Sequence, residues 1–217
     1  MKWAGCASDF FLIWWADGEA APVAVAPSFR RGRLLHSSMH MSQSSASIQP
    51  FEARRVRYES PRSYDDVLED FQRLVDTGDH SAVLEGFSDS VRTREDYENV
   101  VRSQAGESEF MLFASIDHGK WLNVFGIQQR VMRLIFGNPL TAITMMRHDL
   151  AAGLFAPVEM LIVEKGSGDG SIVVYDLPSS MMRIQGNPAM LEAAWELDRK
   201  LQTLVSRVTG VESPRAC

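Results

Sequence analysis

Asp117 and His118 are the side chains whose type and position best suit proton transfer. They follow the apolar run 110–116, where a buried strand is expected to end. A carboxylate and an imidazole can each act as a general base. Successive side chains of a strand point to opposite faces, so the two serve one substrate only if the strand breaks at Gly119. We predict Asp117 or His118 as a general base; the alternative is a turn-stabilising Asp beside a surface His.

A second polar group, Arg147, His148 and Asp149, lies within the segment 140–154, which we expect to be one helix. At 100° per residue, the apolar side chains that would face the core are those of Ile143, Met146, Leu150 and Leu154. His148 then points away from the core, toward solvent, a partner or the lid of a pocket, and is the candidate acid. Arg147 lies nearer the apolar side and needs a carboxylate partner, either Asp117 or Asp149.

Gly137-Asn138-Pro139 marks the start of that helix. Asn is a favoured N-cap and Pro a favoured first helical residue, and the same tripeptide recurs at 186–188, so capping alone can explain it. A helix N-terminus also offers amides and a positive dipole end to an anionic group. The predicted ligand-binding residues are therefore Gly137, Asn138, Pro139, Arg147 and Asp149.

The sequence predicts no metal site and leaves any cofactor unknown. Its histidines and carboxylates lack the HxH or HExxH spacing of metal ligands. Cys6 and Cys217 lie at opposite ends of the chain and can form neither a disulfide framework nor a thiolate zinc site. No Gly-x-Ser-x-Gly elbow occurs, and the glycine-rich loop 166–170 lacks the Lys-Ser/Thr of a phosphate loop. Met145 and Met146 read as core filler or as the lining of an adaptable apolar pocket.

The charge balance argues against nucleic-acid binding. The 217 residues carry a formal net charge of −6. Between Phe51 and Val211 there are 24 acidic and 17 basic residues, which leaves −7. Phosphate backbones require clustered cations, which an acidic domain of this kind lacks.

The pattern of elements predicts an α+β fold. The expected strands are 54–59, 110–116, 131–136, 158–163 and 172–175, and the expected helices are 63–75, 94–104, 140–154 and 189–208. Strands joined by hairpins, with helices between them, favour a single two-layer domain in which a mostly antiparallel sheet packs against helices. We predict this domain over residues 51–211, with a tail at 212–217.

Residues 1–50 differ in composition from the rest. The apolar run 10–16 is far shorter than the roughly 20 residues that span a bilayer. Residues 20–50 contain no acid, hold three arginines between 30 and 33, and are then rich in serine, which is typical of a mitochondrial transit segment. The alternatives are a disordered tail, or a true start at Met39 or Met41. We predict a cytoplasmic protein, or a mitochondrial one if this segment directs import.

Two motifs together resemble the domain of unknown function family 302. They are Ile116-Asp117-His118 at a strand end and the Leu-Ile-Phe-Gly-Asn-Pro box 134–139, followed by Met146, Pro157 and Glu164. The resemblance covers roughly 54–210. It departs from the bacterial pattern at Arg147-His148-Asp149, which is similar to fungal members.

The resemblance implies a compact α+β domain that often self-associates and has no established activity. The positions that match the family's motifs are Asp117, His118, Gly137, Asn138 and Pro139. A homo-oligomer, most simply a homodimer, is the partner that the resemblance implies.

Three functions remain open on the sequence. We favour binding of a small apolar or anionic ligand between the sheet and the 140–154 helix, which requires an apolar cavity of at least about 300 Å³ that reaches Asn138. A proton-transfer enzyme requires His118 and His148 to meet at one cavity. A self-associating scaffold requires an exposed apolar patch well above a few hundred Å².

Overall fold

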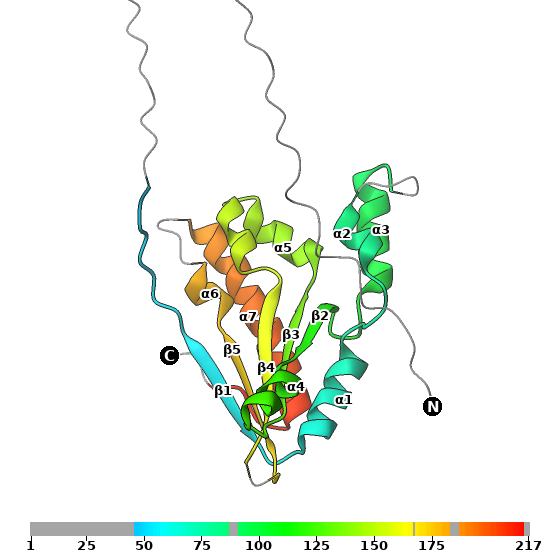
Figure 1. The fold of residues 1–217 in the computed structure, drawn as a ribbon. Helices are drawn as coiled ribbons and strands as arrows, with labels where there is room; N and C mark the ends of the chain where they lie inside the picture. The colour runs from blue at the N-terminus through cyan, green and yellow to red at the C-terminus, as the bar shows by residue number, and fades with distance from the viewer. Residues whose placement is uncertain (1–45, 87–90, 167, 183–186, 215–217) are drawn as a thin grey trace, which may run out of the picture. The chain divides into compact units, whose positions relative to one another are not determined.

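The computed structural model describes residues 46–86, 91–166, 168–182 and 187–214 (Figure 1). Contacts divide the chain into Met1–Ser47 and Ile48–Cys217, and the description that follows concerns the second unit. The segment with transit-like composition lies almost wholly outside the described residues, as do both cysteines.

An antiparallel sheet in the order β1-β5-β4-β3-β2 forms the centre of this unit. Its strands are β1 (Arg55–Ser60), β2 (Met111–Asp117), β3 (Val131–Gly137), β4 (Val158–Glu164) and β5 (Ser171–Asp176). Side chains alternate along each strand, as in β1, where Val56, Tyr58 and Ser60 are buried and the residues between them exposed. The sheet therefore has two chemically different faces.

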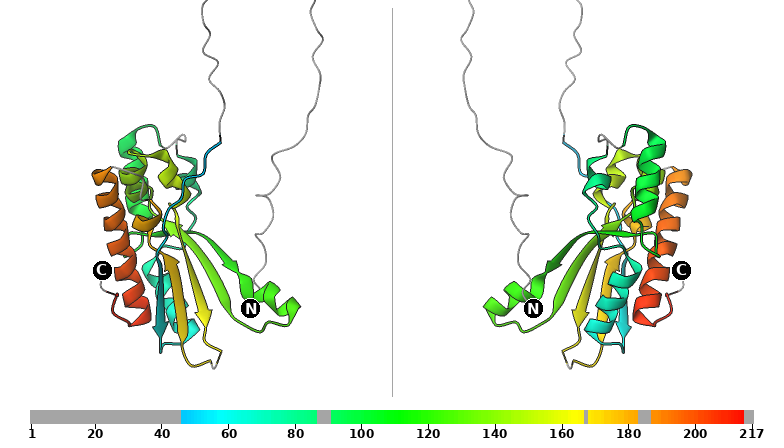
Figure 2. Two further views of the ribbon diagram at one scale, coloured as in Figure 1. Left: turned by 90° about the vertical axis from the view of Figure 1, so that its left-hand side faces the viewer. Right: turned by 90° about the vertical axis from the view of Figure 1, so that its right-hand side faces the viewer.

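The long helices lie on one face of the sheet, here called the covered face. Helices α1 (Tyr64–Leu74) and α7 (Pro188–Thr209) contact each other and strands β1, β4 and β5 (Figure 2). Each begins at a side-chain cap, Ser63 for α1 and Asn187 for α7. The remaining helical elements are α2 (Ser81–Glu85), α3 (Arg94–Gln104), α4 (His118–Leu122), η1 (Asn123–Phe125), α5 (Pro139–Met146), η2 (Leu150–Leu154) and α6 (Pro178–Met181). The chain is an α+β domain with helices packed on an antiparallel sheet.

The opposite face of the sheet, here called the open face, carries the other half of each strand. Residues that pair directly across strands share a face, so the register defines its members. They are Arg55, Arg57 and Glu59 of β1, Ile172, Val174 and Asp176 of β5, Glu159, Leu161 and Val163 of β4, Val131, Arg133 and Ile135 of β3, and Ala114 and Ile116 of β2. None of these fourteen side chains is buried.

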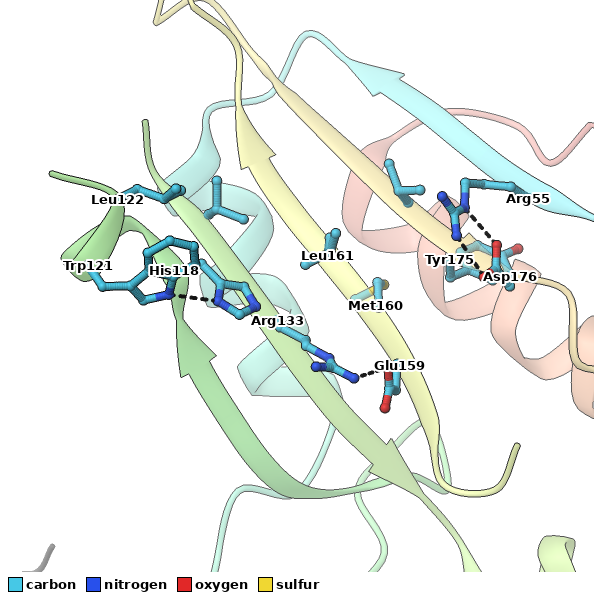
Figure 3. A pocket seen from close by; sticks show the side chains of 12 residues that line it. Arg55, His118, Trp121, Leu122, Arg133, Glu159, Met160, Leu161, Tyr175 and Asp176 are labelled. Atoms are coloured by element: carbon cyan, nitrogen blue, oxygen red, sulfur yellow. Dashed lines mark hydrogen bonds and ion pairs between the residues drawn. The ribbon is translucent and has the colours of Figure 1, made fainter. Parts of the chain in front are cut away.

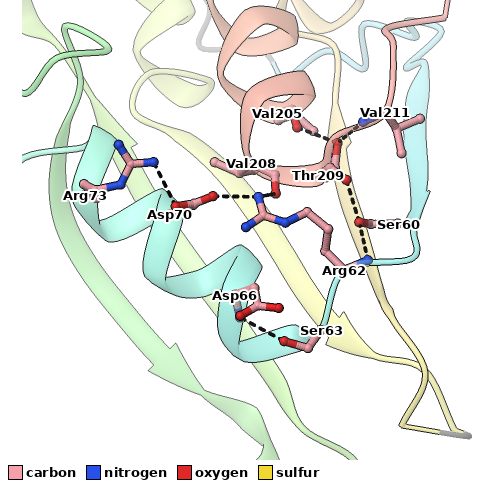
Figure 4. A network of polar contacts seen from close by, with 10 residues as sticks. All are labelled: Ser60, Arg62, Ser63, Asp66, Asp70, Arg73, Val205, Val208, Thr209 and Val211. Carbon is pink, nitrogen blue, oxygen red and sulfur yellow. Dashed lines mark hydrogen bonds and ion pairs between the residues drawn. The ribbon is translucent and has the colours of Figure 1, made fainter.

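A polar junction fastens the first strand and helix to the end of α7 (Figure 4). Arg62 donates to the Asp70 carboxylate at 2.6 Å and to the Val208 carbonyl at 2.7 Å. Ser60 Oγ donates to the Thr209 carbonyl at 2.6 Å. The contacts with Val208 and Thr209 join segments about 150 residues apart in sequence.

The segment 140–154 is not the single helix that its apolar spacing predicts. Helix α5 ends at Met146, and the 3-10 helix η2 starts after Asp149, whose side chain accepts a hydrogen bond from Ala151 N at 2.7 Å. A capping carboxylate offers the backbone an alternative to continued helix. The predicted core side is also wrong, because Met145 and Ala152 are buried. Three of the residues expected in the core are exposed instead: Ile143, Leu150 and Leu154.

No described helix is long and apolar enough to cross a membrane.

Candidate functional site

A cavity of about 400 Å³ lies against α5 and reaches its first residues. Helices α2, α3 and α7, strand β2 and the start of β4 complete its walls. Its lining comprises Val83, Leu84, Tyr97, Phe113, Gly137, Asn138, Pro139, Thr141, Ala142, Met145, Met146, Ala156, Pro157, Val158 and Leu197. We refer to it as the α5 cavity. Three of the five residues predicted to bind a ligand, Gly137, Asn138 and Pro139, lie on its wall.

The first turn of α5 has no amide left for an anion. Asn138 Oδ1 accepts from Leu140 N at 2.8 Å, and the Asn138 carbonyl accepts from the amides of Thr141 and Ala142. Pro139 has no N–H to offer. The Asn138 amide group in turn donates to the Glu109 carbonyl at 2.8 Å. The expectation of free amides in the first turn of α5 is therefore wrong, and the Asn138 side chain is hydrogen-bonded within the protein.

A β-bulge shapes the wall opposite α5. The register of β2 against β3 shifts between Leu112 and Ala114, so Phe113 has no direct partner and its ring lies at the cavity. A Cβ added to Gly137 would lie 3.3 Å from Pro157 and 3.5 Å from the Phe113 ring. Because Gly137 has no side chain, the end of β3 can lie close to both the bulge at Phe113 and the chain that enters β4. The paired methionines were the sequence signal for this pocket; the bulge had none.

Asp117 and His118 lie where β2 ends, at the opposite end of the strand from the α5 cavity. Their side chains line different pockets. Asp117 caps α4, with Oδ1 accepting from Lys120 N at 3.3 Å, and lines a polar pocket of about 580 Å³ beside α1. His118 lines a groove of about 450 Å³ on the open face, where its Nδ1 accepts from Trp121 Nε1 at 3.0 Å (Figure 3). Strand alternation predicted a separation for a strand that continues through His118; the strand instead ends at Asp117 and His118 begins α4, and the two side chains still line different pockets.

The pocket lined by Asp117 contains the guanidinium group of Arg130, whose charge is balanced by neighbouring carboxylates. Arg130 donates two hydrogen bonds to Asp65 at 2.5 and 2.8 Å, lies 3.6 Å from Glu164 and stacks 4.1 Å from the centre of the Tyr64 ring. These hydrogen bonds raise the pKa of Arg130, which stays protonated. Burial raises the pKa of Tyr64, and the neighbouring guanidinium opposes that shift. With its charge balanced, this pocket offers no strong attraction to an anion.

Arg147, His148 and Asp149 form the turn between α5 and η2. Arg147 Nε donates to the Ile143 carbonyl at 3.2 Å rather than to Asp117 or Asp149, and its side chain lines a groove of about 410 Å³ between α3 and α5. His148 is exposed, but it lies in this turn after α5 rather than on the far side of a continuous helix, the position from which its exposure was predicted. Asp149 caps η2. None of the four pockets described here contains both His118 and His148.

Two buried polar groups were missed by sequence reasoning. His80 is buried between the Gln104 side chain, 3.3 Å from Nδ1, and the Asp76 carbonyl, 3.2 Å from Nε2. Asp198 is buried on the apolar side of α7 and accepts from Ser179 N at 3.1 Å and Ser179 Oγ at 2.5 Å. Burial raises the pKa of Asp198, and the bonds from Ser179 oppose the shift. The sequence signal for its burial was helical spacing, because Asp198 lies four residues after Ala194 and three before Leu201, on the apolar side of the helix.

Within the described residues, no group of three or more His, Cys, Asp or Glu side chains is placed to hold a metal ion.

Comparison with known proteins identifies a family but no activity. The profile of the family described as "Domain of unknown function DUF302" matches residues 89–208, which is more than half of the chain and begins later than the expected 54–210. Among solved structures, the uncharacterized conserved protein DUF302 from Bacillus stearothermophilus matches with a TM-score of 0.49 and 14% sequence identity. The alignment covers 71% of this chain and 97% of the other. A search of curated proteins found no match.

Proposed function

The chain belongs to the DUF302 family, and we propose that its domain binds a small apolar molecule in the α5 cavity. The observation that carries this proposal is an apolar cavity of about 400 Å³ that reaches Asn138. Ligand pockets in proteins usually enclose about 300 to 1,000 Å³ and are lined mainly by apolar and aromatic side chains.

The polar groups around the cavity favour an apolar ligand over an anionic one. Asn138 uses both ends of its side chain within the protein, and the Tyr97 hydroxyl donates to the Val83 carbonyl at 3.0 Å. An anion placed there would lose its hydration without gaining hydrogen bonds from the first-turn amides of α5 or from the Tyr97 hydroxyl, which is costly. Met145 and Met146 can adapt their shape to an apolar guest because thioether side chains are flexible and polarisable.

Proton-transfer catalysis receives less support from the geometry. In the four pockets described above, His118 and His148 do not occur together, and Asp117 and His118 line different ones. Asp117, His118 and His148 remain sequence predictions for catalytic residues, and Arg147 and Asp149 remain predictions for ligand contacts.

The test measures binding of the neutral apolar dye N-phenyl-1-naphthylamine to the full chain through the change in the fluorescence of the dye. Ala142→Trp should fill the α5 cavity and abolish saturable binding, because Ala142 lies on its wall. The matched control is Ala151→Trp on exposed η2, which should bind the dye as the unchanged protein does.

A folding control keeps this test interpretable. Thermal melts should show that Ala142→Trp folds, and Met146→Ala, which widens the cavity, should retain the dye with altered affinity. Equal dye binding by the two tryptophan variants would place the dye elsewhere and overturn the proposal. Native against denaturing mass spectrometry of the purified chain would then show whether any guest copurifies.

We also propose a cytoplasmic location, or a mitochondrial one if residues 1–50 direct import. Their acid-free, arginine- and serine-rich composition from residue 20 onward supports the second case. Imaging of a C-terminal fluorescent fusion, with and without residues 1–47, distinguishes the two.

A further inference from the structure

The α5 cavity adjoins a second hollow, the groove of about 410 Å³ between α3 and α5, here called the α3–α5 groove. Four residues line both hollows: Tyr97, Pro139, Ala142 and Met146. The two hollows therefore lie next to each other along α5 and share part of their walls. A long molecule in the cavity has the groove as its neighbouring space.

The α3–α5 groove continues the apolar surface of the cavity. Leu140 and Ile143 line the groove alone, and the Ile143 side chain is 47% exposed. Met146 lies at the boundary between the two hollows, and its thioether side chain is flexible enough to adjust to a guest. Apolar side chains thus extend from the closed end of the cavity to the groove.

The groove differs from the cavity because it contains a cation whose charge no carboxylate balances. The Arg147 side chain is exposed, and its Nε donates to the Ile143 carbonyl at 3.2 Å. Among residues 46–86, 91–166, 168–182 and 187–214, no Asp or Glu side chain forms an ion pair with Arg147. The terminal nitrogens of a guanidinium can hold both oxygens of a carboxylate.

The other charged groups of the groove add to this positive character. Arg94 and Glu98 line it, and Glu98 accepts hydrogen bonds from Arg94 at 2.6 Å and from Arg102 at 2.7 Å. The lining itself carries two cations and one anion, on a chain whose formal net charge is −6. Arg130, in contrast, already has two carboxylates beside it. The α3–α5 groove is therefore the hollow that attracts an anionic group.

We propose that the guest of the α5 cavity is a single-chain amphiphile with a carboxylate head, such as a medium- or long-chain fatty acid. Its hydrocarbon tail lies in the cavity, where Asn138 and Tyr97 use their polar atoms within the protein. Its head lies in the α3–α5 groove and binds Arg147. This inference rests on the proposed function and adds to it the class of ligand and the site of the head group.

The first experiment compares decanoate with decan-1-ol, which has the same chain length and no charge, by isothermal titration of the full chain. Decanoate should bind about fivefold more tightly, the upper range for an exposed ion pair. Arg147→Gln should lower the affinity for decanoate to that for decan-1-ol, and Arg147→Lys should retain most of the preference. The matched control is Arg199→Gln, which removes an exposed guanidinium of α7 that lines none of the four pockets, and it should keep the full preference.

Salt and chain length test the two ends of the ligand separately. The preference for decanoate should shrink between about 0.1 and 1 M salt, as the Debye length falls from about 10 to 3 Å. Dodecanoate, with two more methylenes, should bind more tightly than decanoate by about fourfold per methylene. Ala142→Trp should abolish binding of all three compounds, because Ala142 lines both hollows.

The outcomes separate this inference from the proposed function. If decanoate binds no more tightly than decan-1-ol, or if Arg147→Gln keeps the preference, the carboxylate assignment is overturned while an apolar site in the cavity stands. Binding of the naphthylamine dye without binding of decanoate also overturns this inference alone. If neither the dye nor either amphiphile binds, or if Ala142→Trp leaves their binding intact, both proposals are overturned.

Discussion

The covered and open faces of the sheet are made by the same five strands but differ in what stabilises them. On the covered face, Tyr58, Val173 and Ile162 form one cross-strand row and are almost wholly buried under helices. The matching row on the open face runs Arg57, Val174, Leu161, Arg133 and Ile116, and none of these is buried. Strand alternation creates two faces, and the long helices decide which of them becomes core. The stability of the single chain should therefore depend mainly on the covered face.

The largest expected effect on this comparison comes from removing β1 together with α1, one of the two long helices on the covered face. We expect a fragment spanning only the family match, residues 89–208, to remain unfolded, because it lacks β1 and α1 with Val56, Tyr58, Val67 and Phe71. Each such side chain contributes about 1.5 to 3 kcal/mol by burial, and their sum is comparable with the total stability of a domain. A fragment of residues 48–217 should fold.

Circular dichroism melts of the two fragments provide the measurement. A cooperative transition in the shorter fragment would show that the family match folds without β1 and α1. It would also contradict the domain boundaries of 51–211 that we propose.

Neighbouring valines of β5 give a matched test of the two faces. Val173→Thr should cost about 1 to 3 kcal/mol, because it buries a hydroxyl where Val173 is fully covered. Val174→Thr, the same change one residue later on the open face, should stay within about 0.5 kcal/mol. Urea denaturation at low protein concentration measures both. Similar costs would mean that the open face is also a core surface within one chain.

Asp198 places an ionisable group on the covered side of the sheet, and its contribution to the free energy of unfolding should depend on pH. Because burial raises its folded pKa above the ordinary value of 3.8, its contribution to stability is fully present below about pH 3.8 and is lost as pH rises through the folded pKa. Asp198→Asn should keep both contacts with Ser179 without the ionisation cost. Relative to the unchanged protein, this variant should gain stability as pH rises above about 4. Urea titrations at several pH values test this; a pH-independent difference would contradict it.

The smallest expected effect concerns the cap of α1. Ser63 Oγ accepts from Asp66 N at 3.1 Å, and Ser63→Ala should lower stability by about 1 kcal/mol. Ser63→Thr retains the acceptor and serves as the control. If the alanine variant melts like the control, packing alone must hold α1 on the sheet.

The sequence predicted elements whose signals are local. Capping residues located the starts of α1, α5 and α7. The break after Met146 escaped prediction because apolar spacing over 140–154 suits one helix, and only tertiary packing decides that Met145 rather than Ile143 is buried.

The α5 cavity could be expected only in outline. Asn138 and the methionines pointed to the right region, but the walls also require Val83 and Tyr97 from helices far earlier in the chain. The bulge at Phe113 and the occupied amides at Asn138 depend on atomic contacts that periodicity does not encode.

The pairing of β1 with β5 has a consequence during synthesis. Arg55 and Asp176 pair although they are 121 positions apart, so the first strand leaves the ribosome long before its one partner in the described sheet exists. Residues after β5 are needed as well, because Arg62 and Ser60 bond to the end of α7. The nascent chain must carry an unpaired strand until β5 and α7 have been made, and such non-local closure is slow. The domain is thus completed by its newest residues, and its earliest strand is the one most exposed to chaperones and proteases on the ribosome.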